Sequence, residues 1–223
     1  MPERTRPFAP ERAVLFDFDG TLADTAPDLA AAVNRMRVEQ GAQPLAIEEV
    51  RPFASAGARG LLHAAFGAKP GDAEYPALRE TFLEYYAERL CHDTRLFPGI
   101  AELLEALRAR NMAWGIVTNK ATRFTERILA TLNLEPDCLA CGDTTAHLKP
   151  HPAPLLHAAA QIRIAPQRCL FLGDDLRDIT AAHAAGMRPI AVEWGYHHPD
   201  HGGPASWRAE AVIAHPLEVL PLL

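Results

Sequence analysis

Lysine is scarce in this chain of 223 residues, which also lacks any excess of basic residues and any long apolar run. Lys69, Lys120 and Lys149 are its only lysines, and every other cationic side chain apart from histidine is arginine. The formal net charge of -6 argues against nonspecific binding to nucleic acid or to an anionic membrane, because both attract a basic face. No apolar stretch approaches the roughly 18–20 residues needed to span a membrane. The chain is therefore expected to have neither nucleic acid nor membrane as a partner.

Cysteine is also infrequent, and its four residues are Cys91, Cys138, Cys141 and Cys169. Met1–Arg12 is charged and proline-rich, unlike the apolar segment of a signal peptide, so we expect a cytoplasmic protein without disulfides. Cys138 and Cys141 have the CxxC spacing of redox and zinc sites. They fall in a short apolar run typical of a strand, however, and no further cysteine or histidine stands at ligand spacing. We interpret them as core residues.

Short apolar runs of β type alternate with helical patterns along most of the chain. Since 48% of the residues are hydrophobic and 22% are charged, the composition is that of a globular protein. The runs begin at Ala13 and recur at Ala113–Asn119, Cys138–Gly142, Cys169–Asp174, Pro189–Glu193 and Ala211–Ala214. The helical patterns cover Gly99–Asn111, Thr122–Leu132, Ala153–Gln161 and Leu176–Ala185. This alternation predicts an α/β fold whose parallel sheet is covered on both faces and binds ligands at the carboxyl ends of its strands.

The alternation is interrupted between Asp24 and Phe97, where only helical patterns occur. We expect helices near Pro27–Gln40, Gly57–Phe66 and Tyr75–Cys91, and no strand of comparable quality. An all-helical insertion at this place would form a lid over the strand ends. The predicted organisation is a catalytic core of residues 1–23 and 97–223 with a helical cap of residues 24–96.

Two carboxylates follow the first apolar run, in the segment Asp17-Phe-Asp19-Gly20-Thr21. On an extended strand, residues i and i+2 share a face, so both acids would point the same way. Two like charges at that separation repel each other unless a proton or a cation lies between them. An EF-hand does not fit, because apolar residues precede Asp17 where a further ligand is required. Apolar neighbours on both sides argue against a solvated turn.

Polar residues end three further runs. The segment Gly173-Asp174-Asp175-Leu-Arg-Asp178 could cap the following helix, but three acids in five residues exceed what a cap requires. A hard divalent cation prefers such oxygens. Thr118-Asn119 ends another run, and Lys149-Pro150 lies in a loop after a fourth. These side chains are expected to converge at one edge of the sheet.

Together these segments resemble the haloacid dehalogenase-like hydrolase superfamily, in its phosphatase branch with a helical cap inserted after the first strand. The resemblance extends from Ala13 to about Glu218 and includes four motifs in order, Asp17-x-Asp19-Gly-Thr21, Thr118-Asn119, Lys149-Pro150 and Gly173-Asp174-x-x-x-Asp178. It implies a Rossmann-like, three-layer core with an all-helical cap. Relatives often have a small polar residue at the position of Asp175, and we regard the aspartate here as tolerated.

The resemblance also implies a role for each motif residue. Asp17 would be the nucleophile that forms an aspartyl-phosphate, and Asp19 the general acid and later the general base. Mg²⁺ would be held by the Asp17 carboxylate, the Asp19 backbone carbonyl and Asp174, with Asp178 in or near the coordination shell. Thr118, the Asn119 backbone and Lys149 would hold the phosphoryl oxygens. Such charge stabilisation suits phosphate-monoester hydrolysis, which is among the slowest uncatalysed reactions.

The substrate expected from this resemblance is a small phosphorylated metabolite. The chain is similar to the phosphoglycolate phosphatase group, and most similar to its N-acetylmuramic acid 6-phosphate phosphatase branch. The segments that carry this similarity are Ser55-Ala-Gly57-Ala-Arg59, Trp114–Phe124, Gly173–Ile179, Gly195-Tyr196-x-His198-Pro199, Trp207 and His215–Glu218. N-acetylmuramic acid 6-phosphate and 2-phosphoglycolate are both candidate substrates. The chain is expected to be a monomer or a homodimer.

Alternative functions remain open at this point. A dehalogenase would not need Asp19, whereas a hexose-phosphate mutase retains it and returns the phosphate to the sugar. A non-catalytic phosphate-binding module should have lost one of the motif residues, and all of them are present.

Some residues outside the motifs have two possible roles each. Arg59 could bind a substrate carboxylate or could lie on the cap surface, and Lys120 could support phosphate binding or begin a solvated helix. His197, His198 and His201 suggest a metal cluster by composition, but a polar loop fits their irregular spacing better.

Overall fold

A six-stranded parallel sheet forms the centre of the chain in the computed structural model, which describes residues 10–223. The predicted core segment 1–23 thus begins in residues outside this range. The strands lie in the order β5-β4-β1-β6-β7-β8, with β1 paired to β4 on one side and to β6 on the other. Their bounds are Ala13–Phe16 (β1), Ala113–Val117 (β4), Cys138–Ala140 (β5), Cys169–Gly173 (β6), Arg188–Val192 (β7) and Ala211–Ile213 (β8). All six predicted strands are present.

Side chains alternate between the two faces of this sheet, as the geometry of a strand requires. On β1, Val14 and Phe16 pack with α5 (Ile100–Ala109), α6 (Thr122–Thr131) and the 3-10 segment η5 (Pro216–Leu222). Ala13 and Leu15 face the other side, against α7 (Ala153–Ile162) and α8 (Leu176–Ala185). Three further 3-10 segments are η2 (Pro166–Arg168), η3 (Pro199–His201) and η4 (Pro204–Ser206). The three-layer α/β core is confirmed.

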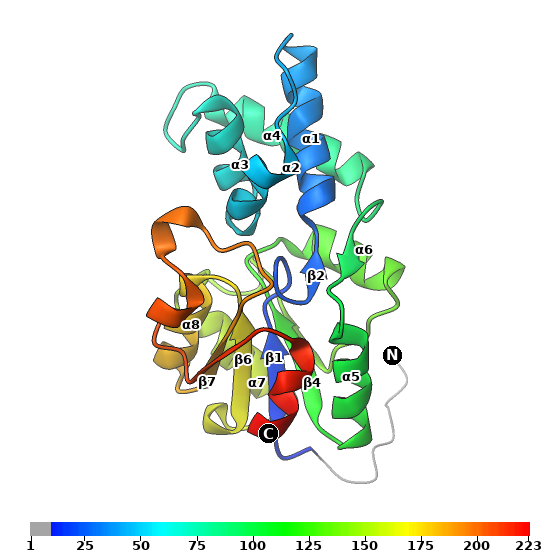
Figure 1. Cartoon of the computed structure of the whole chain (residues 1–223), viewed down its shortest axis with the longest axis vertical. Coiled ribbons are helices and arrows are strands. Elements are labelled where there is room, and N and C mark those ends of the chain that lie inside the picture. The colour runs from blue at the N-terminus through cyan, green and yellow to red at the C-terminus, as the bar shows by residue number, and fades with distance from the viewer. Residues whose placement is uncertain (1–9) are drawn as a thin grey trace.

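Four helices and one 3-10 segment stand above the carboxyl ends of the strands (Figure 1). They are α1 (Ala26–Glu39), α2 (Ile47–Val50), η1 (Arg51–Ala56), α3 (Gly57–Phe66) and α4 (Tyr75–Glu88). Their buried apolar residues form a hydrophobic cluster of their own, which also includes Phe124 and Tyr196 from the core. We call this helical layer the cap. The predicted residue boundaries of core and cap remain a prediction.

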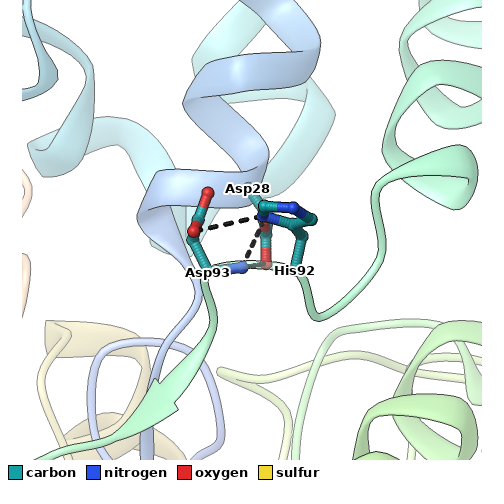
Figure 2. Close-up of side chains that lie close together, drawn as sticks. All are labelled: Asp28, His92 and Asp93. Atoms are coloured by element: carbon teal, nitrogen blue, oxygen red, sulfur yellow. Dashed lines mark hydrogen bonds and ion pairs between the residues drawn. The ribbon is translucent and has the colours of Figure 1, made fainter.

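A small antiparallel ladder joins the two layers, and the sequence had not led us to expect it. β2 (Ala23–Asp24) pairs with β3 (Arg95–Leu96), so both chain connections between core and cap pass through it. Beside this ladder, the buried carboxylate of Asp28 accepts the backbone N–H groups of Asp93 and Thr94 and the Thr94 hydroxyl. Asp28, Asp93 and His92 form a compact cluster (Figure 2), but the Asp28 oxygens are already used in fixing the chain. This cluster is therefore structural.

All four cysteines are unpaired and buried, as expected for Cys138 and Cys141. Burial raises the pKa of Cys138 to about 12 and that of Cys169 to about 11, so neither is a ready thiolate. Within residues 10–223, no helix combines the length and apolar character needed to cross a membrane.

Candidate active site

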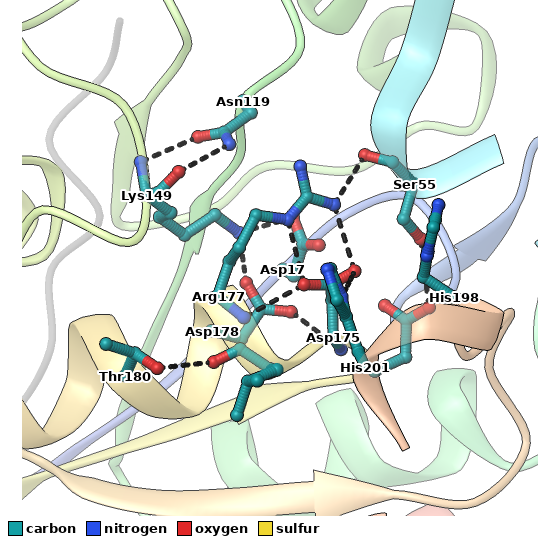
Figure 3. Close-up of polar contacts among 12 residues, drawn as sticks. Asp17, Ser55, Asn119, Lys149, Asp175, Arg177, Asp178, Thr180, His198 and His201 are labelled. Carbon is teal, nitrogen blue, oxygen red and sulfur yellow. Dashed lines mark hydrogen bonds and ion pairs between the residues drawn. The ribbon is translucent and has the colours of Figure 1, made fainter. Parts of the chain in front are cut away.

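Strand ends bring predicted site residues next to one another, and Figure 3 shows Asp17, Lys149 and Asp178 among them. Asp17 directly follows β1, Thr118 follows β4 and Asp174 follows β6, and β1 lies between the other two. The backbone continues the sheet for one more bond, since Asp17 N donates to the Leu172 carbonyl at 2.8 Å. The convergence predicted from the sequence is therefore produced by the order of the strands.

The carboxylates of Asp17, Asp174 and Asp178 form a buried cluster whose ligand oxygens lie within 4.8 Å of one another. Burial raises the pKa of all three groups, that of Asp178 to about 7, and the remaining carboxylates add to the effect. Three crowded acids with so little solvent favour a proton or a cation. Hard oxygen donors of this kind fit a hard divalent cation.

Lys149 neutralises part of this cluster from the loop after β5. Its Nζ lies 2.8 Å from Asp17 Oδ1 and 2.7 Å from Asp178 Oδ1, and its side chain is 2% exposed. Burial disfavours the ammonium, but the two carboxylates outweigh that cost and raise the pKa of Lys149. Asn119 fixes the loop, because its side-chain amide donates to the Lys149 carbonyl and accepts the Lys149 N–H. The Asn119 side chain thus ties the end of β4 to the loop that contains Lys149.

Asp19 has a separate lysine partner. Lys120 Nζ lies 2.9 Å from Asp19 Oδ1, and the Thr25 hydroxyl donates to the same oxygen at 2.5 Å. The Lys120 side chain is 8% exposed, so the expectation of a solvated helix start is wrong for this residue. Its ammonium also lies 4.8 Å from the centre of the Tyr86 ring in the cap.

Asp17 and Asp19 each have an ammonium partner of their own. β1 ends at Phe16, so the two acids lie in the turn after the strand and the alternation of an extended strand does not apply. In both acids these contacts reach Oδ1, and no hydrogen bond from residues 10–223 reaches either Oδ2.

Asp174 is oriented by three donors that sequence reasoning had not assigned. The Thr21 hydroxyl donates to Oδ1, while the Ser55 hydroxyl and the Tyr196 N–H donate to Oδ2, at 3.0, 3.1 and 2.9 Å. Gly20 has a φ of 89°, and a Cβ there would lie 2.2 Å from Asp174 Oδ2. Glycine is therefore required beside this carboxylate both for its backbone conformation and for space.

A second polar chain connects the core to the cap. The Asp175 carboxylate accepts hydrogen bonds from the backbone N–H and from the guanidinium of Arg177. The same guanidinium donates through Nη2 to the Ser55 carbonyl in the cap, at 3.0 Å. His201 Nδ1 lies 3.2 Å from the Asp175 carboxylate. Asp175 is therefore the N-cap of α8 and an ion-pair partner (Figure 3). His198 contacts the Phe53 ring. Among residues 10–223, the histidines of this loop join no group with metal-ligand geometry.

A cavity of about 440 Å³ lies between the strand ends and the cap. Asp174 does not line this cavity. The other predicted site residues line it, and they are Asp17, Asp19, Arg59, Thr118, Asn119, Lys120, Lys149 and Asp178. The cap contributes Ser55 from η1 and a stripe of α4 that sequence reasoning had missed. The helical spacing of four residues in this segment could have indicated a shared face, and they are Tyr75, Arg79, Phe82 and Tyr86.

Known proteins share both the sequence and the fold of this chain. Residues 14–192 match the model of the family described as haloacid dehalogenase-like hydrolase. An N-acetylmuramic acid 6-phosphate phosphatase of Pseudomonas aeruginosa is 44% identical over 214 residues, which cover 95% of this chain and 94% of the relative. A phosphoglycolate phosphatase of Xanthomonas campestris pv. campestris is 44% identical over 207 residues, 92% of this chain and 93% of the relative.

A solved structure shows the same fold. The crystal structure described as a predicted phosphoglycolate phosphatase from Haemophilus somnus superimposes with a TM-score of 0.82 at 28% identity, and covers 95% of this chain and 97% of its own. The resemblance noted from the motifs is confirmed over almost the whole chain. The protein belongs to the haloacid dehalogenase-like hydrolase family.

Proposed function

We propose that this chain is a Mg²⁺-dependent phosphomonoesterase that hydrolyses a small phosphorylated metabolite through an aspartyl-phosphate intermediate. The observation that carries the proposal is the pair of acids after β1. Each is tied through Oδ1 to its own lysine, and neither Oδ2 accepts a hydrogen bond from residues 10–223. The names of the two relatives support a phosphatase acting on N-acetylmuramic acid 6-phosphate or 2-phosphoglycolate.

The first chemical step would use Asp17 as the nucleophile. Its free Oδ2 attacks phosphorus, the bond from phosphorus to the ester oxygen breaks, and Asp19 gives a proton to the departing alkoxide. Thr118, the Asn119 backbone and Lys149 hold the phosphoryl oxygens. Mg²⁺ held by Asp17, the Asp19 carbonyl, Asp174 and Asp178 would supply positive charge against which a carboxylate can approach a phosphate.

The second step would return Asp17 to its starting state. Asp19, now ionised, takes a proton from water as the water oxygen attacks phosphorus, and the bond between phosphorus and Asp17 breaks. Inorganic phosphate and the free alcohol are the products. A mutase would differ only here, because a sugar hydroxyl would take the place of water.

A comparison of substrates tests the proposed function. With Mg²⁺, the purified chain is expected to release inorganic phosphate from N-acetylmuramic acid 6-phosphate or 2-phosphoglycolate, and EDTA is expected to stop the release. Glucose 1-phosphate serves as the mutase control, since a mutase converts it to glucose 6-phosphate without release of phosphate. The absence of turnover of every ester would contradict the proposal and favour a binding module.

Replacing Lys120 with methionine is expected to slow hydrolysis of alkyl phosphates much more than hydrolysis of p-nitrophenyl phosphate. Lys120 fixes Asp19 by Oδ1 and so orients the acid that protonates the leaving group. An alkoxide needs that proton and nitrophenolate does not, so kcat/KM should fall about 10- to 100-fold for the alkyl ester alone. Lys69→Met is the matched control, because Lys69 is exposed and outside the cavity. An equal loss with both esters would assign Lys120 to phosphate binding instead.

A further inference from the structure

One residue of the cap makes two polar contacts with the turn between β6 and α8. The hydroxyl of Ser55, in η1, donates to Asp174 Oδ2 at 3.1 Å. The Ser55 backbone carbonyl accepts from Arg177 Nη2 at 3.0 Å, as Figure 3 shows. Within residues 10–223, no other side chain of the cap donates a hydrogen bond to Asp17, Asp174 or Asp178. Ser55 is therefore the direct link between the cap and the carboxylate cluster.

The buried carboxylate of Asp174 is fixed at both of its oxygens. The core supplies two donors, the Thr21 hydroxyl to Oδ1 at 3.0 Å and the Tyr196 N–H to Oδ2 at 2.9 Å. Ser55 is the third donor, and it alone of the three comes from the cap. Groups that hydrogen-bond to a metal ligand orient it, and their removal typically lowers metal affinity about 10- to 100-fold. The cap thus contributes to the orientation of this carboxylate.

The second contact of Ser55 is supported by an ion pair in the core. The Arg177 guanidinium donates to both oxygens of the buried Asp175 carboxylate, through Nε at 2.8 Å and through Nη2 at 3.0 Å. A bidentate pair of this kind fixes the direction of the guanidinium as well as its position. Asp175 therefore aims Arg177 at the Ser55 carbonyl, so the same turn of the core holds Ser55 at its hydroxyl and at its backbone.

Weaker contacts hold the rest of η1 near the strand ends. Arg51 Nη1 lies 2.8 Å from Asp24 Oδ1, in an ion pair whose two side chains are both partly exposed. The Phe53 ring packs edge-on against His198, with the ring centroids 5.3 Å apart. A short segment held by a few partly exposed contacts opens locally at a small cost in free energy. Removal of the Ser55 hydroxyl should therefore change how often η1 leaves the core, and the fold should stay intact.

We propose that Ser55 is a positioning residue that couples the docking of η1 on the core to cation binding at Asp174. This inference rests on the metal-dependent function proposed above. When η1 is docked, the hydroxyl holds the Asp174 carboxylate in one orientation, and a carboxylate fixed by a cation stays within reach of that hydroxyl. Such coupling is reciprocal, so the factor by which docking raises the cation affinity equals the factor by which the cation favours docking. A cation would therefore strengthen the contact between cap and core before any substrate binds.

The chain contains two serines, which provide the variant and its matched control. Ser206 is exposed in η4 outside the cavity, and its hydroxyl donates to the Gly203 carbonyl of its own loop at 2.7 Å. Calorimetric titration with Mg²⁺, without substrate, should give a Kd about 3- to 10-fold higher for Ser55→Ala than for wild type. The effect should be smaller than is typical because the Tyr196 N–H still donates to the same oxygen. Ser206→Ala should change the Kd by less than about 2-fold.

Hydrogen exchange at the backbone amides of η1 measures the reciprocal effect. Added Mg²⁺ should slow this exchange about 3- to 10-fold in wild type and in Ser206→Ala, and should leave it nearly unchanged in Ser55→Ala. Exchange in α5 of the core is the internal control and should not respond. An unchanged Kd in Ser55→Ala would overturn the positioning role, and an equal effect of Mg²⁺ on η1 in wild type and in Ser55→Ala would overturn the coupling. If wild-type protein binds no Mg²⁺, the metal-dependent function itself is wrong.

Discussion

Replacing Asp17 with asparagine is expected to abolish hydrolysis of every phosphate ester while the protein stays folded. The amide is close to the carboxylate in shape, and its oxygen can still accept from the Phe18 N–H and from Lys149 at Oδ1. What disappears is the second carboxylate oxygen, which no group of residues 10–223 engages by a hydrogen bond and which we assign as the nucleophile. Without a nucleophile the loss in kcat should be on the order of 10³-fold or more.

The measurement for Asp17→Asn is phosphate release with Mg²⁺, alongside circular dichroism and the melting temperature of the same sample. Asp72→Asn is the matched control, because Asp72 is an exposed cap residue outside the cavity and should keep full activity. An acid quench of the wild-type reaction with labelled substrate should trap phosphate on the protein, and none should appear on the variant. Retention of a tenth of wild-type activity by Asp17→Asn would rule out the aspartyl-phosphate mechanism.

The elements of the core could be predicted because each has a strong local signal. The runs at β1, β4 and β6 are continuous and apolar, which is typical of strands buried on both faces. The pair β2 and β3 could not be found in this way, since two-residue strands have no periodicity and form only when the ends of the cap meet. The 3-10 segment η1 was missed for a similar reason, because Arg51–Ala56 mixes charged, aromatic and small residues without a helical pattern.

Local motifs likewise identified the residues of the site that follow the strands, but not the contacts made across the cavity. Asp17, Thr118, Lys149 and Asp174 stand out by position at the ends of apolar runs. The pairing of Lys120 with Asp19 joins residues 101 positions apart, and no spacing rule predicts it. Ser55 and Tyr86 reach the site only because the cap packs over the strand ends. The residues that the cap contributes to the cavity therefore depend on tertiary packing more than the motif residues do.

Replacing Lys149 with methionine is expected to cause the second large loss, in both stability and activity. The ammonium lies between Asp17 and Asp178, and burial leaves almost no solvent to take its place. Removing one partner of a buried ion pair leaves uncompensated charge and costs about 3–5 kcal/mol. Hydrolysis should fall on the order of 10²- to 10³-fold or more, because the variant also lacks the group assigned to the phosphoryl oxygens.

The scarcity of lysine provides the controls for Lys149→Met. Lys69→Met makes the same change at the one lysine outside the cavity, where the side chain is exposed, and both activity and melting temperature should stay unchanged. Lys149→Arg keeps the charge but replaces a compact ammonium with a planar guanidinium, so it should recover more stability than activity.

Added Mg²⁺ should raise the melting temperature of Lys149→Met more than that of wild type, because the variant has more uncompensated carboxylate charge. If Lys149→Met melts at the wild-type temperature without Mg²⁺, the cluster does not need this cation for its stability.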